Sequence, residues 1–334
     1  MAADSRPLVV VGGPIHQDGY ALLESEARVV VCDDLTEDGM IGAAAHAEGI
    51  LFLLKPTCSE RLMGACQKLK VVGRHGAGLD TIEMPAASRL GIAVVHAPGS
   101  NSQSVAEHAM LLILSCAKQA HRVDRLTRAG DWGAVEAQEL FELKGKTLGI
   151  VGVGNIGRIT ARLAAAFGMR VLGYDPYVPD DELRRRGADP VKSLDALLPQ
   201  IDVLTCHAPL TPETRGMINA RTLGLMKKGA VYVNTSRGPV QDERALFEAL
   251  TRGHLGAAGI DVFEEEPSSV DNPLFNLDNV TVSSHVAGVT AEANRTMAMQ
   301  VAGEMLRVLR GEMPHVLANR DLLPRLGHLR PTTR

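Results

Sequence analysis

Three polar residues late in the chain follow apolar, valine-rich runs that are typical of buried strands. They are Arg237, Glu266 and His285. A guanidinium binds a carboxylate through two parallel hydrogen bonds, and a histidine can give and take a proton near neutral pH. Because ligands of open parallel sheets bind at the carboxyl ends of the strands, these side chains are candidates for one site.

Each candidate also has a plain structural interpretation. A loop arginine is often a surface residue, a lone histidine is more often structural than catalytic, and the acid-rich segment 261–266 resembles a solvated loop. Glu264 and Glu265 keep that interpretation. The combination of an arginine, an acid and a histidine after successive strands is more informative, because it supplies the carboxylate contact and the proton that hydride transfer to or from a hydroxyacid requires.

An earlier glycine motif predicts a dinucleotide site. Gly152, Gly154 and Gly157 form the pattern GxGxxG between the apolar run 147–151 and the segment 158–167, which has a helical apolar face. Such glycines permit a tight turn, close approach to a pyrophosphate and packing of helix on strand, while amides at the helix start bind the anion. The motif alone is weak: an empty glycine turn and an S-adenosylmethionine site use similar patterns. Nothing else in the chain indicates methyl transfer.

Asp175 indicates which dinucleotide is bound. It ends the next expected strand, 170–174, at roughly the 20-residue spacing typical of these sites. A carboxylate there accepts hydrogen bonds from the ribose hydroxyls and repels a 2′-phosphate. The sequence therefore favours NAD over NADP.

The whole chain alternates short apolar runs with helix-like segments, which predicts α/β architecture. We expect two doubly wound parallel-sheet domains, Rossmann-like or flavodoxin-like, with a cleft between them. The expected strands are 8–11, 28–31, 49–53, 71–74 and 93–96 in the first sheet, and 147–151, 170–174, 203–206, 230–235, 257–262 and 280–283 in the second.

One domain should be inserted into the other. A long helix from Ser104 to 129, with Glu107 completing a capping box, leads out of the first sheet. A helix over 290–309 leads back to it. The expected bounds are 1–103 and 290–334 for a discontinuous substrate-binding (catalytic) domain, and 104–289 for a NAD-binding Rossmann domain.

Composition argues against several other classes of protein. The chain has 334 residues, a formal net charge of −4 and only 3% aromatic residues, so neither nucleic acid nor a membrane surface is an expected partner. The apolar stretches fall far short of the roughly 20 residues that cross a bilayer, and the N-terminal residues lack a leader pattern. Five scattered cysteines without ligand spacing predict reduced thiols, no metal site and a cytoplasmic location.

Ordered motifs along nearly the full length make the chain similar to the D-isomer-specific 2-hydroxyacid dehydrogenase family. The resemblance is to phosphoglycerate dehydrogenase and hydroxypyruvate reductase types without a C-terminal regulatory domain. It implies an oxidoreductase that interconverts a D-2-hydroxyacid and a 2-ketoacid with NAD(H). It also implies that the protein is a homodimer. The matching stretches are 76–80, 98–101, 104–108, 143–158, 207–214, 226–238, 258–267 and the segment around His285.

The resemblance also implies a role for each residue. Arg237 would bind the substrate carboxylate, His285 would be the acid/base, and Glu266 would hydrogen-bond the histidine. The implied cofactor-binding set is Gly152, Gly154, Asn155, Ile156, Gly157, Asp175, Ala208, Thr235, Ser236, Asp261, Gly288 and Ser104. The implied substrate-binding set is Arg74, Ala77, Gly78, Asn101 and Arg237.

Some positions depart from the family pattern. Ser284 stands where a proline is common, and Gln241 replaces a commonly apolar residue. Lys55 or Arg74 could face a substrate phosphate, but a double positive site is not evident, so phosphoglycerate, glycerate, glyoxylate and lactate all stay open. Trp132 would either cross to the neighbouring subunit or pack on its own surface.

Two alternatives remain at this point. One is a dinucleotide-sensing corepressor or adaptor on the same fold, and the other is a phosphite-type dehydrogenase. A formate enzyme is disfavoured, because its histidine pairs with glutamine rather than with an acid such as Glu266.

Overall fold

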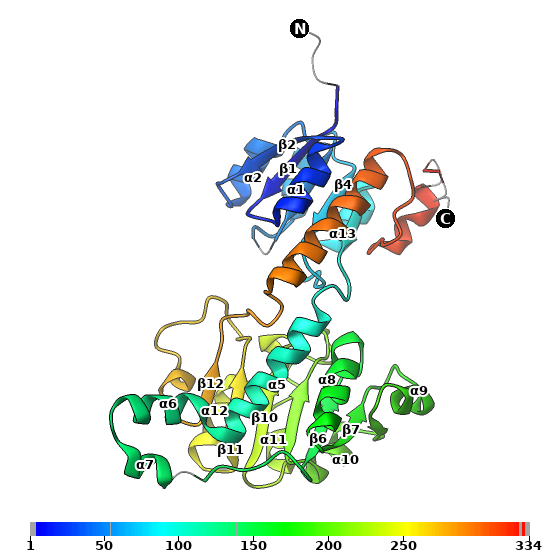
Figure 1. Cartoon of the computed structure of the whole chain (residues 1–334). Coiled ribbons are helices and arrows are strands. Elements are labelled where there is room, and N and C mark those ends of the chain that lie inside the picture. The colour runs from blue at the N-terminus through cyan, green and yellow to red at the C-terminus, as the bar shows by residue number, and fades with distance from the viewer. Residues whose placement is uncertain (1–4, 54, 138, 327–328, 331–334) are drawn as a thin grey trace. The chain divides into compact units, whose positions relative to one another are not determined.

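The computed structural model describes residues 5–53, 55–137, 139–326 and 329–330. The chain divides into two compact units, Met1–Asn101 with Val289–Arg334 (unit 1) and Ser102–Gly288 (unit 2). These bounds lie one or two residues from those expected from the sequence. Each unit is a parallel sheet with helices on its faces (Figure 1).

Unit 1 contains a five-stranded parallel sheet in the order β2-β1-β3-β4-β5. Its inner strands are continuous apolar runs because both of their faces are covered, whereas the edge strand β2 leaves Val30 and Val31 exposed. The strands are β1 (Leu8–Gly12), β2 (Arg28–Cys32), β3 (Gly49–Phe52), β4 (Val71–Arg74) and β5 (Ala93–His96).

The helix α13 (Ala291–Leu309) brings the end of the chain back to this sheet, as predicted. The Thr290 hydroxyl caps it by accepting a hydrogen bond from the Ala293 amide at 3.1 Å. The helix packs on α1, β4 and β5 (Figure 1). Gly73 in β4 makes room for it, since a Cβ there would lie 2.4 Å from the Met305 sulfur. The other helices of unit 1 are α1 (Gln17–Glu24), α2 (Glu37–Ala44), α3 (Glu60–Ala65), α4 (Met84–Leu90) and η4 (Arg320–Arg325).

Unit 2 contains a seven-stranded parallel sheet in the order β12-β11-β10-β9-β6-β7-β8. The strand order reverses between β6 and β9, and ligands of such sheets bind where it does so. The sequence predicts all of these strands except β8, whose two residues include Pro190 and carry no periodic signal. The strands are β6 (Thr147–Val151), β7 (Arg170–Tyr174), β8 (Asp189–Pro190), β9 (Val203–Cys206), β10 (Ala230–Asn234), β11 (Leu255–Ile260) and β12 (Val280–Val282).

Helices cover both faces of this sheet and form two apolar layers. One layer contains Leu112 of α5 and Ala161 of α8, and the other contains Leu223 of α11 and Leu246 of α12. The helical segments of unit 2 that flank the sheet are α5 (Ser102–Lys118), α8 (Asn155–Ala166), α9 (Asp180–Arg185), α10 (Leu194–Leu197), η1 (Leu198–Gln200), α11 (Ala220–Leu225), η2 (Gly238–Val240), α12 (Glu243–Thr251) and η3 (Pro273–Asn276).

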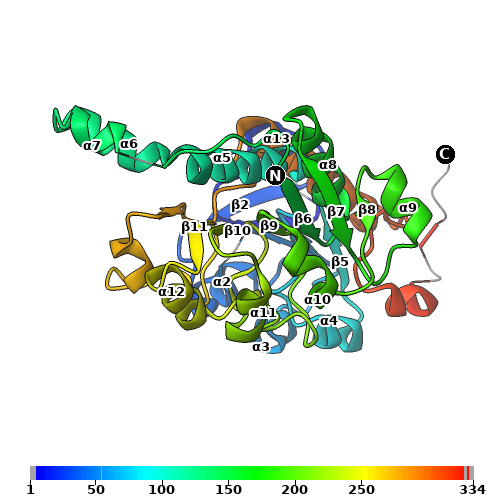
Figure 2. The same cartoon turned by 90° about the horizontal axis from the view of Figure 1, so that it is seen from below.

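The long helix predicted from Ser104 to 129 is wrong in two respects. The helix α5 starts at Ser102, and Glu107 accepts a hydrogen bond from the Gln103 side chain at 2.7 Å within the helix instead of completing a capping box. Gln119 then adopts a left-handed conformation (φ 45°) and separates α5 from α6 (Ala120–Arg128). Figure 2 shows α6 and α7 (Trp132–Glu136) projecting away from the sheet of unit 2, and neither contains a buried residue.

Candidate active site

The glycine motif forms a tight turn between β6 and α8. Gly152 has φ 84°, and a Cβ on it would lie 2.8 Å from the Ala208 amide nitrogen. A Cβ on Gly157 would lie 2.3 Å from the Gly152 carbonyl oxygen, so this glycine lets helix and strand pack closely. A Cβ on Gly154 would meet nothing within 4 Å. The turn therefore leaves open space beside the amides of Asn155 and Ile156 at the start of α8, which fits a bound pyrophosphate.

Asp175 is fixed beside this turn at the end of β7. Its Oδ2 accepts a hydrogen bond from the Val153 amide at 3.0 Å, and its Oδ1 accepts one from the Tyr177 amide at 3.0 Å. The neighbouring cation, Arg186, donates to the Val153 carbonyl at 2.7 Å and is paired with Glu182 at 2.7 Å. The carboxylate is thus fixed beside the glycine turn by two backbone amides, while the arginine charge next to it is already matched by an acid.

Buried polar groups lie behind the turn. His207 is partly buried after β9; its Nε2 lies 3.2 Å from the Thr205 hydroxyl and its Nδ1 lies 3.4 Å from the Thr235 hydroxyl. Burial lowers the pKa of His207 to about 3, so the ring is neutral at physiological pH. Ala208, the next residue, is buried against Gly152.

Arg237 follows β10 in a turn that is organised by one buried amide. The Asn234 side chain donates to the Arg237 carbonyl and to the Gln241 Oε1, both at 3.0 Å. It also accepts from the Ser236 amide at 2.9 Å and from the Ser236 hydroxyl at 2.8 Å. Gln241, the departure from the family pattern, therefore supports the arginine turn through Asn234.

Gly238 joins this turn to the acidic segment. A Cβ on Gly238 would lie 1.7 Å from the Phe263 carbonyl oxygen, so only glycine allows this approach. The segment that follows Phe263 carries Glu266. The arginine turn and the glutamate are thereby held against each other.

His285 and Glu266 form a close pair. The His285 Nδ1 lies 2.6 Å from the Glu266 Oε2, and the Glu266 Oε1 accepts a hydrogen bond from the Phe263 amide at 3.0 Å. Burial acts to raise the pKa of the Glu266 carboxyl, but the hydrogen bonds from His285 and Phe263 and the charge of Arg237 bring that pKa below its usual value. Glu266 is therefore ionised at neutral pH, and it leaves the His285 Nε2 available for proton transfer.

Asp261 holds the loop that carries His285. Its backbone carbonyl accepts from the His285 amide at 2.7 Å, and its Oδ1 accepts from the Ser283 hydroxyl at 2.6 Å and the Val286 amide at 3.0 Å. Its Oδ2 accepts from the Ala287 amide at 3.0 Å. These three bonds use most of the roughly four acceptor positions of a carboxylate. Asp261 therefore acts first as an anchor for the loop, and little remains for a nicotinamide carboxamide.

The expected substrate-binding residues other than Arg237 lie in unit 1. Arg74 is buried at the end of β4, where it donates to the His75 carbonyl. A Cβ on Gly76 would lie 2.6 Å from the Arg74 guanidinium, so the backbone at Gly76 packs closely against this charged side chain. The Ala77 carbonyl lies 2.9 Å from the His96 Nδ1, and burial lowers the pKa of His96.

The structure thus gathers the reactive residues in unit 2 and the substrate candidates in unit 1. Their meeting at one site stays a prediction. Unit 2 contains Arg237, Glu266 and His285 with the cofactor candidates, including Thr235, Ser236, Ser104 in α5 and Gly288 at its last position; unit 1 contains Arg74, Ala77, Gly78 and Asn101.

Sequence reasoning does not single out three of the groups that organise the site. Asn234 and Ser283 are polar residues at the carboxyl ends of strands, and that position is the signal that could have found them. His108 lies in α5, and its contact with Ser283 spans a sequence separation of 175 residues. Local sequence patterns cannot predict a contact between residues so far apart in the chain.

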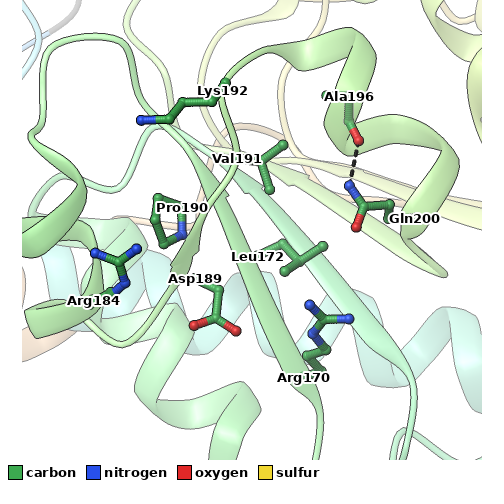
Figure 3. A pocket seen from close by; sticks show the side chains of 9 residues that line it. All are labelled: Arg170, Leu172, Arg184, Asp189, Pro190, Val191, Lys192, Ala196 and Gln200. Atoms are coloured by element: carbon green, nitrogen blue, oxygen red, sulfur yellow. Dashed lines mark hydrogen bonds between the residues drawn. The ribbon is translucent and has the colours of Figure 1, made fainter.

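A surface pocket lies beside β8 (Figure 3) and contains none of the predicted site residues. Arg170 stands at the start of β7, whereas Asp175 follows its end. Lys192 at the pocket is paired with Asp180 at 2.5 Å. We assign no role to this pocket, which is lined by Arg170, Leu172, Arg184, Asp189, Pro190, Val191, Lys192, Ala196 and Gln200.

Comparison with known proteins identifies the family. Residues 110–287 match the NAD binding domain of the D-isomer specific 2-hydroxyacid dehydrogenases. The chain is 39% identical over 325 residues to D-3-phosphoglycerate dehydrogenase of Methanocaldococcus jannaschii, covering 97% of this chain and 62% of that protein. It is 35% identical over 334 residues to glyoxylate reductase of Thermofilum pendens, covering 96% of each. The crystal structure of a glyoxylate reductase from Paecilomyes thermophila superimposes with a TM-score of 0.86 at 29% identity, covering 95% of this chain and all 100% of that one.

The chain therefore belongs to the D-isomer specific 2-hydroxyacid dehydrogenase family, and unit 2 contains its NAD-binding domain. The predicted family, fold class and cofactor are confirmed. The chain spans 62% of the length of the Methanocaldococcus relative.

Three further observations concern the described part of the chain. None of its helices combines the length and the apolar character needed to span a membrane. Within the same residues, no group of three or more His, Cys, Asp or Glu side chains is placed to hold a metal ion. All five cysteines are buried and unpaired.

Proposed function

We propose that the protein is a NAD-dependent D-2-hydroxyacid dehydrogenase, an oxidoreductase that interconverts a D-2-hydroxyacid and a 2-ketoacid. The observation that carries this proposal is the pairing of His285 with Glu266 at 2.6 Å, held against the Arg237 turn. This arrangement supplies a proton donor and a carboxylate-binding cation side by side.

The chain's own residues would divide the work as follows. Arg237 binds the carboxylate of the ketoacid and polarises its carbonyl. His285 donates the proton on its Nε2 to the carbonyl oxygen as it becomes a hydroxyl, and takes the proton back in the oxidative direction. Glu266 accepts from Nδ1 and stabilises the imidazolium. NAD(H), when bound, supplies or accepts the hydride.

Gly152, Gly154, Asn155, Ile156 and Gly157 would hold the pyrophosphate through backbone amides. Asp175 would accept hydrogen bonds from the adenosine ribose, with Ala208 beside it. Thr235, Ser236, Gly288 and Ser104 complete the proposed cofactor set, while Asp261 holds the loop that carries His285. The Asp175 carboxylate beside the turn would repel a 2′-phosphate, and the neighbouring Arg186 is already paired with Glu182, which supports NAD over NADP.

Unit 1 would supply the remaining substrate contacts, from Arg74 and the amides of Ala77 and Gly78, with Asn101 at its edge. The substrate itself is proposed at the level of the class, a small D-2-hydroxyacid or its ketoacid. No observation favours the corepressor or the phosphite-type alternative.

We also propose that the protein is a homodimer in the cytoplasm. The arm formed by α6 and α7 has no buried residue, and Trp132 on it is 68% exposed. A second copy of the chain that covers this arm would bury the tryptophan. Sedimentation analysis of the wild-type chain and of Trp132→Ala tests this: a monomeric wild-type protein would refute the dimer.

The function is tested by NADH and NADPH oxidation with glyoxylate, hydroxypyruvate, pyruvate and 3-phosphohydroxypyruvate. We expect turnover with NADH and at least one ketoacid, and loss of nearly all turnover in His285→Ala with NADH affinity nearly unchanged. Absence of turnover with the whole panel, or full turnover in His285→Ala, would refute the assignment.

A further inference from the structure

In the helix α5, the His108 side chain contacts the segment that leads into the loop of His285. The His108 Nε2 lies 2.8 Å from the Ser283 hydroxyl, and that hydroxyl lies 2.6 Å from the Asp261 Oδ1. The His108 Nε2 itself is 3.7 Å from the Asp261 Oδ1. A chain of hydrogen bonds therefore runs from α5 through Ser283 to the buried carboxylate.

The direction of these bonds follows from their chemistry. An ionised carboxylate only accepts hydrogen bonds, so the single hydroxyl proton of Ser283 goes to Asp261. The Ser283 oxygen must then accept from His108, which requires a proton on the His108 Nε2. Both the Nε2–H tautomer and the cation of His108 meet this requirement.

The loop that these hydrogen bonds reach, which carries His285, is strained and needs support. His285 has φ 56°, a left-handed conformation that is uncommon for a residue other than glycine. Strained residues persist where their surroundings over-determine them. Here Asp261 binds the amide of His285 with its carbonyl and the amides of Val286 and Ala287 with its carboxylate.

We propose that His108 is a positioning residue for His285, acting through Ser283 and Asp261. By holding the Ser283 hydroxyl, His108 fixes the orientation of the Asp261 carboxylate, and that carboxylate holds the strained loop so that the His285 ring points correctly. The inference rests on the proposed function for its kinetic consequence, but the anchoring of the loop is independent of it.

The protein supplies a matched control two residues before Ser283. His121 in α6 has its Nδ1 3.1 Å from the Thr281 hydroxyl and its Nε2 2.9 Å from the Asp278 carbonyl. This is also a bond between a histidine and a hydroxyl, but Thr281 lies within β12 and the bond is not part of the hydrogen-bond network to Asp261. His121→Leu therefore measures what losing such a bond does to the strand alone.

The kinetic test compares His108→Leu, Ser283→Ala, His108→Gln and His121→Leu in the full chain. We expect kcat for ketoacid reduction to fall by about tenfold in the first two variants, the scale seen when supporting hydrogen bonds of a site are removed. The NADH dissociation constant should stay within about twofold, because the glycine turn is untouched. His108→Gln should recover most of the activity, since its amide nitrogen can donate from the Nε2 position.

Hydrogen exchange provides a readout that needs no activity. The amides of Val286 and Ala287 should exchange faster in His108→Leu and Ser283→Ala than in the wild type and in His121→Leu. Equal exchange and equal kcat in His108→Leu and His121→Leu would overturn the proposal. If the wild type turns over no ketoacid, the proposed function fails, while the exchange rates still decide whether His108 anchors the loop.

Discussion

Replacing Glu266 by glutamine is the most direct test of the proposed proton transfer. The variant keeps an acceptor for the His285 Nδ1 but removes the negative charge that lies 2.6 Å from it. A hydrogen bond to a charged group contributes about 1.5–3 kcal/mol. The two side chains are 29% and 35% exposed, so water screens part of this interaction and the lower value applies. With about 1.4 kcal/mol per factor of ten in rate, we expect kcat for ketoacid reduction to fall about tenfold.

The assay is pre-steady-state oxidation of enzyme-bound NADH by the best ketoacid of the panel, measured between pH 5 and 9. Reduction requires a proton on His285, and the glutamine no longer supplies the negative charge that stabilises the protonated ring. The rate of the variant should therefore stay below that of the wild type throughout this range. A variant with an unchanged rate would refute the role of Glu266. A change confined to the NADH dissociation constant would refute it as well.

Three further predictions follow from buried or tightly packed groups. Burial lowers the pKa of His207 in the folded protein to about 3, below its unfolded value of about 6.5. Between these two pH values the unfolded chain therefore binds more protons than the folded one. The free energy of unfolding decreases as the pH falls through this interval. From pH 7 to 5 this loss is about 2 kcal/mol at most, and urea unfolding of the wild type and His207→Gln should reveal it as a pH dependence that the variant lacks. Asp175→Ala should raise the ratio of NADPH to NADH turnover by about tenfold or more, because repulsion of the 2′-phosphate disappears; an unchanged ratio would contradict this role. Gly157→Ala should weaken NADH binding and lower the unfolding midpoint, since its Cβ would lie 2.3 Å from the Gly152 oxygen, and unchanged values of both would contradict the close packing.

The sequence predicts most of the strands of both sheets because they are short apolar runs rich in valine and isoleucine that alternate with helix-like segments. The pairing of His285 with Glu266 is implied by the resemblance to the family, and the structure has the two side chains 2.6 Å apart. The features that the sequence does not predict depend on the backbone conformation of single residues or on contacts between side chains. The left-handed Gln119 ends α5 without any glycine or proline signal, and the Gln103–Glu107 bond competes with the expected capping box.

The support of the reactive groups is harder to predict than the groups themselves. Asn234 and Gln241 meet because the chain turns back on itself after β10, and His108 meets Ser283 only after the whole sheet has formed. Asp261 is a candidate from its type and position. The number of loop amides that it binds becomes visible only in the folded chain.

The reactive residues occupy one continuous stretch of chain, Ser102–Gly288, whereas unit 1 is assembled from the two stretches that flank it. Arg237, Glu266 and His285 are held by contacts inside that single stretch. Under the proposed function unit 1 supplies the substrate contacts, so substitutions there would alter which acid is accepted while the proton-transfer pair stays intact. Replacing both flanking stretches with those of a relative is accordingly a route to a new substrate preference with the same chemistry.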